Sequence, residues 1–388
     1  MSNNVKKVYV AMSGGVDSSV AALLLKEKSY EVTGVFMRNW HAAIHDGFVG
    51  DCPWQADWDD VQVVCEILKI PCKIWDFSKE YYADVVEYFF REYEAGRTPN
   101  PDVMCNKYIK FGKFLDKALA EGVDYVATGH YARLRLETLN SKSKTLNKFK
   151  IQNSKLQKEN IKDYPSQVTR YSLLTGVDSN KDQSYFLWTL TQEQLRHVLF
   201  PIGELEKPRV RALAKTAGLP TYDKKDSQGI CFIGNIDVQK FLRSRLPEKI
   251  GDIITINGQK VGEHSGAYFF TEGQRKGIDI GGTVLPYYVA KVNVCDNTLT
   301  VVEGDNHPAL FKNNLTTSRV NWIAGVEPEM PLSCQARIRY RQAVQDCIVE
   351  KNNGKIMVNF KQPQRAVSPG QSIVFYQSEE CLGGGIIN

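Results

Sequence analysis

The chain has 388 residues, of which 43% are hydrophobic and 24% charged, and it carries a net charge of +5. This composition is ordinary for a soluble globular protein of two or three domains. No apolar run reaches the roughly 18 to 20 residues of a membrane span, and a predicted strand begins within about ten residues of the start, which leaves no room for a signal or transit peptide. We therefore expect a cytoplasmic protein that has no membrane partner.

The positive charge is concentrated in one segment. Residues 138–166 contain seven lysines and two acidic residues, a surplus that accounts for the whole net charge. Lys, Asn, Ser and Gln dominate there, so we expect an extended, mobile surface insertion whose lysines add nonspecific affinity for RNA. For the rest of the chain, an RNA partner must be argued from local patterns.

The first third of the chain alternates strand and helix patterns. Apolar runs alternate with segments whose apolar residues recur at helical spacing. The predicted strands are 6–12, 30–37, 70–77 and 124–131, and the predicted helices begin at residue 16 and span 57–69, 78–96 and 108–122. Repeated β-α units with near-continuous apolar strands predict an α/β fold with a doubly wound parallel sheet.

The pattern changes in the second half. Short helices dominate residues 207–248, and Gly-rich connections follow at 271–282. After about residue 284, apolar and polar residues alternate, which predicts a small antiparallel barrel or sandwich. The predicted strands there include 289–294, 298–304, 334–341 and 355–360. We expect an α/β domain of residues 1–207, a small central domain of 208–283 and a C-terminal β domain of 284–388.

The most specific motif is AMSGGVDSS at residues 11–19. It follows a predicted strand and opens a helix, so its glycines and N–H groups can wrap a phosphate at the positive helix end. The G-K-[ST] of a P-loop is missing, which argues against transfer of the γ-phosphoryl group. Ser13, Asp17 and Ser18 surround the two glycines with polar groups and favour this interpretation over a plain Gly-rich turn.

Two further strand ends should lie at the same edge of the sheet, where open α/β sheets bind ligands. Met37 could pack on an adenine, and Gly129 lets a nucleotide approach the backbone. His130 could equally be a histidine of the core.

The nine cysteines are scattered and form no C-x-x-C pair, which argues against a disulfide framework and against a zinc knuckle. Most are expected to pack in the interior, clearly so for four of them and less clearly for two. The four are Cys65, Cys295, Cys334 and Cys347, and the two are Cys52 and Cys72.

Cys105 and Cys231 differ because both sit in polar settings that predict loops. Lys107 near the first, and Lys224 with Lys225 near the second, could lower a thiol pKa, as could the helix predicted after Cys105. Both are candidates for reactive thiols. A metal or iron–sulfur role is a weaker alternative, because only Asp102 offers a third ligand.

Two basic patterns suggest contact with RNA. In ARIRYRQ, Arg337, Arg339 and Arg341 alternate with apolar residues, so one strand face would carry three guanidiniums. A solvated strand face explains this pattern equally well. KPRVRALAK, at residues 207–215, predicts a second basic face on a helix.

Seven motifs, in this order, resemble the bacterial tRNA-specific 2-thiouridylases. They are SGGVDSS, RTPNPDVMCNKYIKFG, ATGHYAR, DSNKDQSYFL, DSQGICFIG, GEHSGAYFFTEGQRKGI and RIRYR. The resemblance covers nearly the whole chain, except residues 138–166. It implies a nucleotide-binding α/β domain of the adenine nucleotide α-hydrolase type with a pyrophosphatase-type (PP) loop, a small central domain and a C-terminal β-barrel.

The resemblance also implies an activity and its site. The enzyme would use ATP, with Mg²⁺, to place AMP on the C2 oxygen of a wobble uridine in tRNA, and sulfur would then replace that oxygen. ATP would contact Ala11, Met12, Ser13, Gly14, Gly15, Val16, Asp17, Ser18, Met37 and Gly129. Cys231 would carry sulfur as a persulfide, Cys105 would be the nucleophile that ends in a disulfide with it, and Asp102 would act as a base or orient the uridine.

The tRNA itself would meet two groups of residues. Asn100, Pro101 and Asp102 would face the target base. Other contacts would come from Lys181, Asp182, Gln183, Arg339, Tyr340, His130 and Gln371. A cysteine desulfurase or a sulfur-relay protein would deliver the sulfur.

Two alternatives compete with this hypothesis. Another ATP-splitting enzyme with the same loop, such as an amidotransferase-type synthetase or a lysidine-type tRNA modifier, would use ammonia or an amine and would not need Cys231. A non-catalytic RNA-binding or sulfur-carrier protein would form no AMP.

Overall fold

The computed structural model describes residues 5–40, 54–140, 167–225, 238–278, 280–281 and 285–388. Its first layer is a parallel sheet of order β3-β2-β1-β4-β7. The strands are β1 (Lys7–Met12), β2 (Glu31–Arg38), β3 (Cys72–Asp76), β4 (Tyr125–Thr128) and β7 (Val198–Leu199). The chain runs outward from β1 through β2 to β3 and then returns to β4 on the other side of β1, so the β1–β4 border is the topological switch point.

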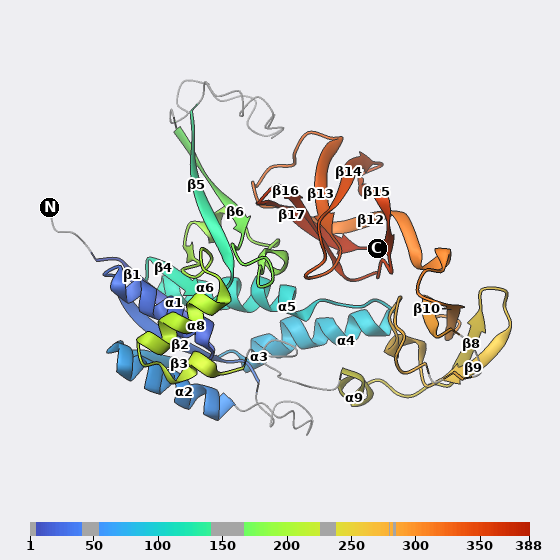
Figure 1. The fold of residues 1–388 in the computed structure, drawn as a ribbon, viewed down its shortest axis with the longest axis horizontal. Coiled ribbons are helices and arrows are strands. Elements are labelled where there is room, and N and C mark those ends of the chain that lie inside the picture. Colours follow the sequence, from blue (N-terminus) through green and yellow to red (C-terminus); the bar gives the residue numbers. More distant parts are fainter. Residues whose placement is uncertain (1–4, 41–53, 141–166, 226–237, 279, 282–284) are drawn as a thin grey trace.

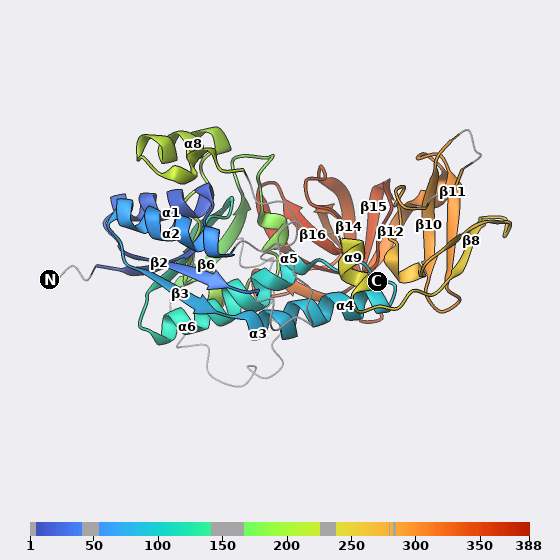
Figure 2. The ribbon, with the colours of Figure 1, turned by 90° about the horizontal axis from the view of Figure 1, so that it is seen from below.

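Helices cover both faces of this sheet (Figure 2). One face carries α1 (Val16–Glu27), α2 (Trp54–Leu68) and α8 (Lys207–Thr216). The other carries α3 (Ser78–Tyr81), α4 (Glu87–Glu94), α5 (Pro101–Met104) and α6 (Phe114–Ala120), with π-helical segments at Tyr82–Val86 and Cys105–Lys113. Alternate residues of β1 enter different cores: Val8 and Val10 pack under α1, whereas Ala11 packs toward α4 and α6. The predicted doubly wound α/β sheet is confirmed.

The C-terminal strands form a closed antiparallel barrel. Its order is β12-β15-β14-β13-β16-β17, and pairing of β12 with β17 closes it. The strands are β12 (Phe311–Trp322), β13 (Leu332–Arg337), β14 (Gln345–Asn352), β15 (Lys355–Arg365), β16 (Ser372–Gln377) and β17 (Glu380–Ile387). The predicted barrel is confirmed.

A hairpin from the first part of the chain joins the barrel. Strands β5 (Ala132–Asn140) and β6 (Gln167–Thr175) pair along their whole length, and β6 pairs with β17. The hairpin projects from the body of the molecule (Figure 1). Of the predicted insertion at 138–166, residues 138–140 end β5, and 141–166 lie outside the described residues.

The central part of the chain has a sheet of its own, of order β10-β11-β8-β9. Its strands are β8 (Gly251–Thr255), β9 (Lys260–His264), β10 (Tyr287–Asn293) and β11 (Thr298–Glu303), and α9 (Val238–Arg243) precedes them. The sequence pattern assigned residues 287–303 to the C-terminal domain, but their partners lie in the central sheet. The pairing therefore fits a boundary between β11 and β12 better than one at 284.

The described residues also include shorter elements. They are the helix α7 (Gln192–Leu195) and short 3₁₀ segments at Ser184–Phe186, Pro220–Asp223, Ala267–Phe269 and Pro308–Leu310. In the described part of the chain, no helix has both the length and the apolar character needed to cross a bilayer.

Candidate active site

The loop between β1 and α1 lies at the switch point and has the geometry of an anion-binding turn. Ser13 N–H donates to the Ser18 hydroxyl at 3.2 Å, and that hydroxyl donates to Gly15 O at 3.1 Å. Gly15 is the N-cap of α1 and supplies no side chain, so the first N–H groups of this 12-residue helix have no side-chain cap. Such N–H groups, together with the helix dipole, attract a phosphate.

Two glycines bring the backbones around this loop into close contact. Gly14 has φ +72°, and a Cβ there would lie 2.7 Å from Asp57 O. A Cβ at Gly129, which follows β4, would lie 2.7 Å from Ser18 N. Both positions therefore need glycine, one for its backbone conformation and both for the close approach. These close approaches fix the path of the backbone around the start of α1.

The carboxylate of Asp17 is held by two side chains from distant parts of the sequence. Lys207 Nζ donates to both carboxylate oxygens at 2.8 Å, and Tyr131 Oη donates to one of them at 2.7 Å. Lys207 is 8% exposed, although the sequence pattern assigned it to a basic helix face. Of that face, Arg209 and Lys215 are exposed and Lys207 is not, so this prediction was wrong for Lys207.

The end of β2 supplies two buried residues. Met37 is 3% exposed and packs in the core on the α4 side of the sheet. Asn39 is 2% exposed, and its side-chain amide has no hydrogen-bond partner among the residues that the structure describes. An unsatisfied buried amide at the carboxyl edge of a parallel sheet is compatible with a ligand there.

Cys105 lies in a helix and not in a loop. The helical stretch begins at Pro101, earlier than the predicted start at 108, because Asn100 Oδ1 accepts the Val103 N–H at 3.2 Å and Pro101 occupies the first helical turn. Cys105 starts the π-helical segment and has no solvent exposure. The polar setting predicted for this thiol was therefore wrong, and the N-P-D sequence was the cap signal that would have corrected it.

The segment ahead of Cys105 is attached to the barrel. Gln371 Nε2 donates to the carbonyls of Thr98 and Pro99, both at 3.0 Å, and Thr98 N–H donates to Pro369 O at 2.8 Å. Asp102 follows in the first turn of α5. These hydrogen bonds of Gln371 thus fix the position of the backbone that leads to residues 100–102.

Cys231 and Cys52 lie outside the described residues, so the pairing of Cys231 with Cys105 stays a prediction. The Nζ atom of Lys224, which the sequence places near Cys231, lies 2.7 Å from Asp57 Oδ1 and close to Asp60. Burial alone would lower the pKa of Lys224, but hydrogen bonds to these two carboxylates raise it. The ammonium is thus paired with acidic groups of α2.

The remaining cysteines divide by their surroundings. Cys65 is 1% exposed, and burial raises its pKa to about 12, so it is a packing residue as predicted. Cys334 and Cys347 are neighbours across β13 and β14, with Sγ atoms 3.7 Å apart. Cys295 is exposed in the turn between β10 and β11, so its predicted burial was wrong.

His130 is a core residue. It is 7% exposed, its Nδ1 lies 2.7 Å from Thr128 Oγ1, and its ring packs against Phe111 and Phe200. Burial, with a smaller contribution from Lys110, lowers its pKa well below the usual value. Of the two interpretations open from the sequence, the structure favours the core histidine.

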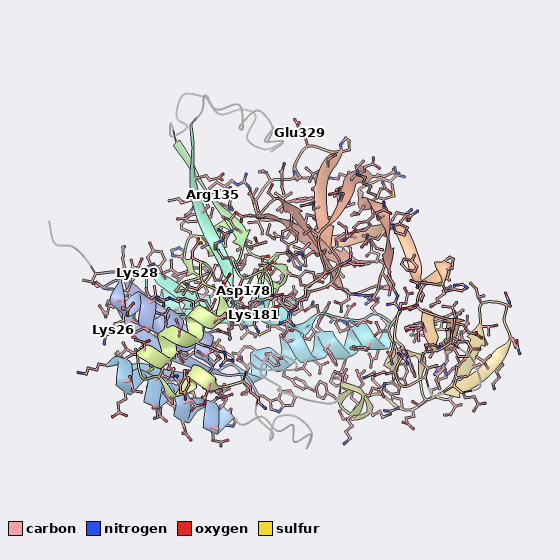
Figure 3. The ribbon with its side chains drawn as sticks, in the orientation of Figure 1. Lys26, Lys28, Arg135, Asp178, Lys181 and Glu329 are labelled. Carbon is pink, nitrogen blue, oxygen red and sulfur yellow. The ribbon has the colours of Figure 1, made fainter. Side chains whose placement is uncertain are left out.

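The loop at 178–184 is fixed mostly by its own acidic and amide groups. Asp182 Oδ1 accepts the N–H groups of Gly176 and Ser184, both at 3.1 Å, and Oδ2 accepts a guanidinium N–H of Arg337 at 2.7 Å. Gln183 Oε1 accepts the Tyr131 N–H at 3.0 Å. Lys181 is half-buried in this loop, and Figure 3 shows it near Asp178 beside α8.

The arginines of ARIRYRQ do not share a strand face, so this prediction was wrong. Strand β13 ends at Arg337, and a turn follows in which Arg341 has φ +62°. Arg337 binds Asp182, whereas Arg339 donates to the carbonyls of residues 365 and 366. Tyr340 packs on Phe186 at a ring distance of 4.5 Å. Arg339 and Arg341 remain exposed and can meet a polyanion.

A metal site is not apparent in the described residues: no group of three or more His, Cys, Asp or Glu there could hold an ion. Sequence reasoning missed Lys207 and Tyr131 as neighbours of the loop, because both are distant from it in the chain. It also missed Asn106, a 2% exposed residue next to Cys105, which donates to Phe186 O at 3.2 Å. Its own Oδ1 has no hydrogen-bond partner within the described part of the chain.

Together, the fold and the loop define an α/β protein with a nucleotide-binding domain of the HUP class, joined to a central β domain and a C-terminal barrel. Three family models agree with this class. They are described as the tRNA methyl transferase HUP domain at residues 6–235, the tRNA methyl transferase PRC-barrel domain at 239–303 and the aminomethyltransferase β-barrel domain at 312–387.

Similarity to curated proteins is more specific. The tRNA-specific 2-thiouridylases MnmA of Francisella tularensis subsp. novicida and subsp. holarctica are each 47% identical to this chain over 387 residues, which is 98% of this chain and 99% of theirs. The chain therefore belongs to the tRNA-specific 2-thiouridylase family. A solved NMN synthetase from Francisella tularensis covers 58% of this chain and 67% of its own at 14% identity, but its TM-score of 0.30 is too low to support an argument.

Proposed function

We propose that this chain is a tRNA-uridine 2-sulfurtransferase, which uses ATP to replace the C2 oxygen of the wobble uridine in tRNA with sulfur. The observation that carries the proposal is a Gly-rich loop, at the sheet's switch point and ahead of a helix without a side-chain cap, in a chain 47% identical to 2-thiouridylases over almost its whole length. The chemistry needs this loop, because an oxygen on C2 leaves poorly until it becomes part of AMP. The cytoplasm is the compartment expected for such an enzyme.

ATP is the proposed co-substrate, bound with Mg²⁺ by residues 11–18, Met37 and Gly129. The uncapped start of α1 would bind its phosphates, and the absence of G-K-[ST] from the sequence fits cleavage between the α and β phosphates. In the first step, the C2 oxygen of the uridine would attack the α phosphate, and pyrophosphate would leave.

The base would be held by Asn100, Pro101 and Asp102. Asn100 caps α5, and the barrel holds the preceding backbone through Gln371. Such support from two directions favours a fixed geometry for the first turn of α5. The carboxylate of Asp102 would then orient the uridine or accept its proton.

Sulfur would come from a persulfide on Cys231, which a cysteine desulfurase or sulfur-relay protein regenerates. The terminal sulfur would attack C2 and expel AMP. The Cys105 thiolate would then attack Sγ of Cys231, which forms a Cys105–Cys231 disulfide and leaves the second sulfur on C2. A dithiol reductant would reopen the disulfide. Because Cys105 is fully buried, its surroundings must rearrange before this attack.

Residues proposed for tRNA contact fall into two groups. Lys181, Arg339 and Tyr340 are partly or fully exposed and would touch the tRNA directly. Asp182, Gln183, His130 and Gln371 have side chains engaged with protein groups, so their proposed effect on tRNA is through the shape of the surface they hold.

The test is a reconstituted reaction with ATP, a persulfide donor and unmodified tRNA, followed by mass analysis of the nucleosides. Cys105→Ser and Cys231→Ser should each abolish 2-thiouridine while tRNA binding stays near wild type. Cys295→Ser, which removes an exposed thiol in a distant turn, is the matched control. Activity that survives either change would refute the two-thiol mechanism.

The same assay separates the alternatives. Nucleoside masses distinguish sulfur in place of oxygen from an added amine or methyl group. AMP formation that depends on tRNA but not on Cys231 would favour an amine-transferring synthetase. A protein that binds tRNA without forming AMP would be a binding module.

A further inference from the structure

Lys207 lies in a position that local structure does not explain. It is the first residue of α8, where the helix dipole disfavours a cation, and it is 8% exposed, whereas a lysine is rarely buried unless it is paired. A specific interaction must offset both costs. Such an interaction is made with Asp17, whose two carboxylate oxygens both accept from Nζ at 2.8 Å.

Asp17 itself creates a difficulty for a phosphate-binding loop. It lies in the first turn of α1, within the segment proposed to bind ATP. A carboxylate within a few ångströms of a polyphosphate repels it strongly. The bidentate ammonium of Lys207 cancels this charge, and the Tyr131 hydroxyl, at 2.7 Å from Oδ1, fixes the carboxylate's orientation.

Lys207 is in turn held by the loop proposed to meet tRNA. Its backbone N–H donates to Asp178 Oδ2 at 2.9 Å, so Asp178 caps α8 from outside the helix. Asp178 is only three residues before Lys181, and both lie beside α8 (Figure 3). Gln183 of the same loop binds the Tyr131 N–H. Two hydrogen-bonded connections thus join this loop to Asp17.

We propose that Lys207 is a positioning residue for ATP: it neutralises and orients Asp17 in the phosphate-binding loop, and Asp178 anchors it from the tRNA-facing loop. This inference rests on the proposed function, because it takes ATP as the ligand of residues 11–18. Lys207 acts through Asp17 and does not itself need to touch the substrate.

The test compares steady-state kinetics and direct ATP titration of the full chain. Lys207→Met should raise the ATP Kd and KM by about tenfold or more, because an unneutralised carboxylate then faces the phosphates, while kcat changes little. Lys207→Arg keeps the charge and should stay near wild type. Lys215→Met removes an exposed lysine of the same helix and is the matched control.

A double variant distinguishes this role from a general loss of structure. If Lys207 acts by cancelling the charge of Asp17, Asp17→Asn combined with Lys207→Met should bind ATP better than Lys207→Met alone. It also removes the uncompensated carboxylate, so it should fold even if the single variant does not. Asp178→Asn should give a smaller change in the same direction, because it weakens the anchor of Lys207 and leaves every charge of residues 11–18 in place.

Three outcomes would overturn the inference: an unchanged ATP Kd in Lys207→Met, an effect equal to that of Lys215→Met, or a double variant no better than the single one. Wild-type protein that forms no 2-thiouridine would instead count against the proposed function. The two failures are therefore separable, since ATP titration is read without tRNA and without turnover.

Discussion

The buried ion pair between Arg337 and Asp182 gives the sharpest test of how the barrel is joined to the α/β domain. The two side chains are 16% and 1% exposed, and they connect residues 155 apart in the sequence. Arg337 also stacks over the Tyr376 ring at 4.9 Å. Arg337→Met would keep much of the aliphatic packing but leave the Asp182 carboxylate buried without its counter-ion.

The expected cost follows from these contacts. Removing one partner of a buried pair typically costs about 3–5 kcal/mol. Asp182 would keep its hydrogen bonds from Gly176 N–H, Ser184 N–H and Ser184 Oγ, so we expect the lower end of this range, about 3 kcal/mol. Urea unfolding of the whole chain, followed by circular dichroism, measures this loss. Arg341→Met, at an exposed position nearby, should change stability by less than about 0.5 kcal/mol.

The salt dependence of tRNA binding provides an independent test of the role of Arg337. A phosphate contact on duplex-like or single-stranded RNA contributes about 0.7–0.9 to the slope of log affinity against log salt. Arg337 is bound to Asp182, so Arg337→Met should leave this slope unchanged at temperatures where the variant is folded. A variant with wild-type stability and a reduced slope would refute the structural role and restore the strand face predicted from the sequence.

Two further predictions concern residues at the end of β4. Gly129→Ala places a Cβ 2.7 Å from Ser18 N, so it should cost about 1–3 kcal/mol and weaken ATP binding. Gly281→Ala, whose added Cβ meets no atom of the described residues within 4 Å, should do neither in the same urea and ATP titrations. Burial lowers the pKa of His130 in the folded chain, so below pH 6.5 the unfolded chain binds more protons than the folded chain. The contribution of this residue to stability is therefore complete above pH 6.5 and is lost as the pH falls below it. His130→Phe should remove a slope of up to about 1.4 kcal/mol per pH unit that sets in as the pH falls below about 6.5. Identical pH profiles of unfolding for wild type and variant would contradict the assignment.

Local sequence was sufficient for the main elements and for the phosphate loop. Continuous apolar strands such as β1, and the two glycines at the start of α1, specify their conformation through near neighbours, so a parallel sheet and an anion-binding turn could be predicted. The same local information was misread at Cys105. Polar neighbours suggested a loop, but Asn100 and Pro101 begin a helix whose other face enters the core, and only the packing of that face shows the thiol to be buried.

The tertiary structure alone determined the partners of charged and polar side chains. Lys207 and Arg337 belong to basic runs that predict solvent-facing or RNA-facing surfaces, yet both bind carboxylates, 190 and 155 residues away respectively. Sequence alone established which residues could bind an anion. Whether such a residue can still bind an anion in the folded chain depends on the carboxylates near it. A buried charge needs a counter-ion, and long-range packing determines which carboxylate lies close enough to serve as one.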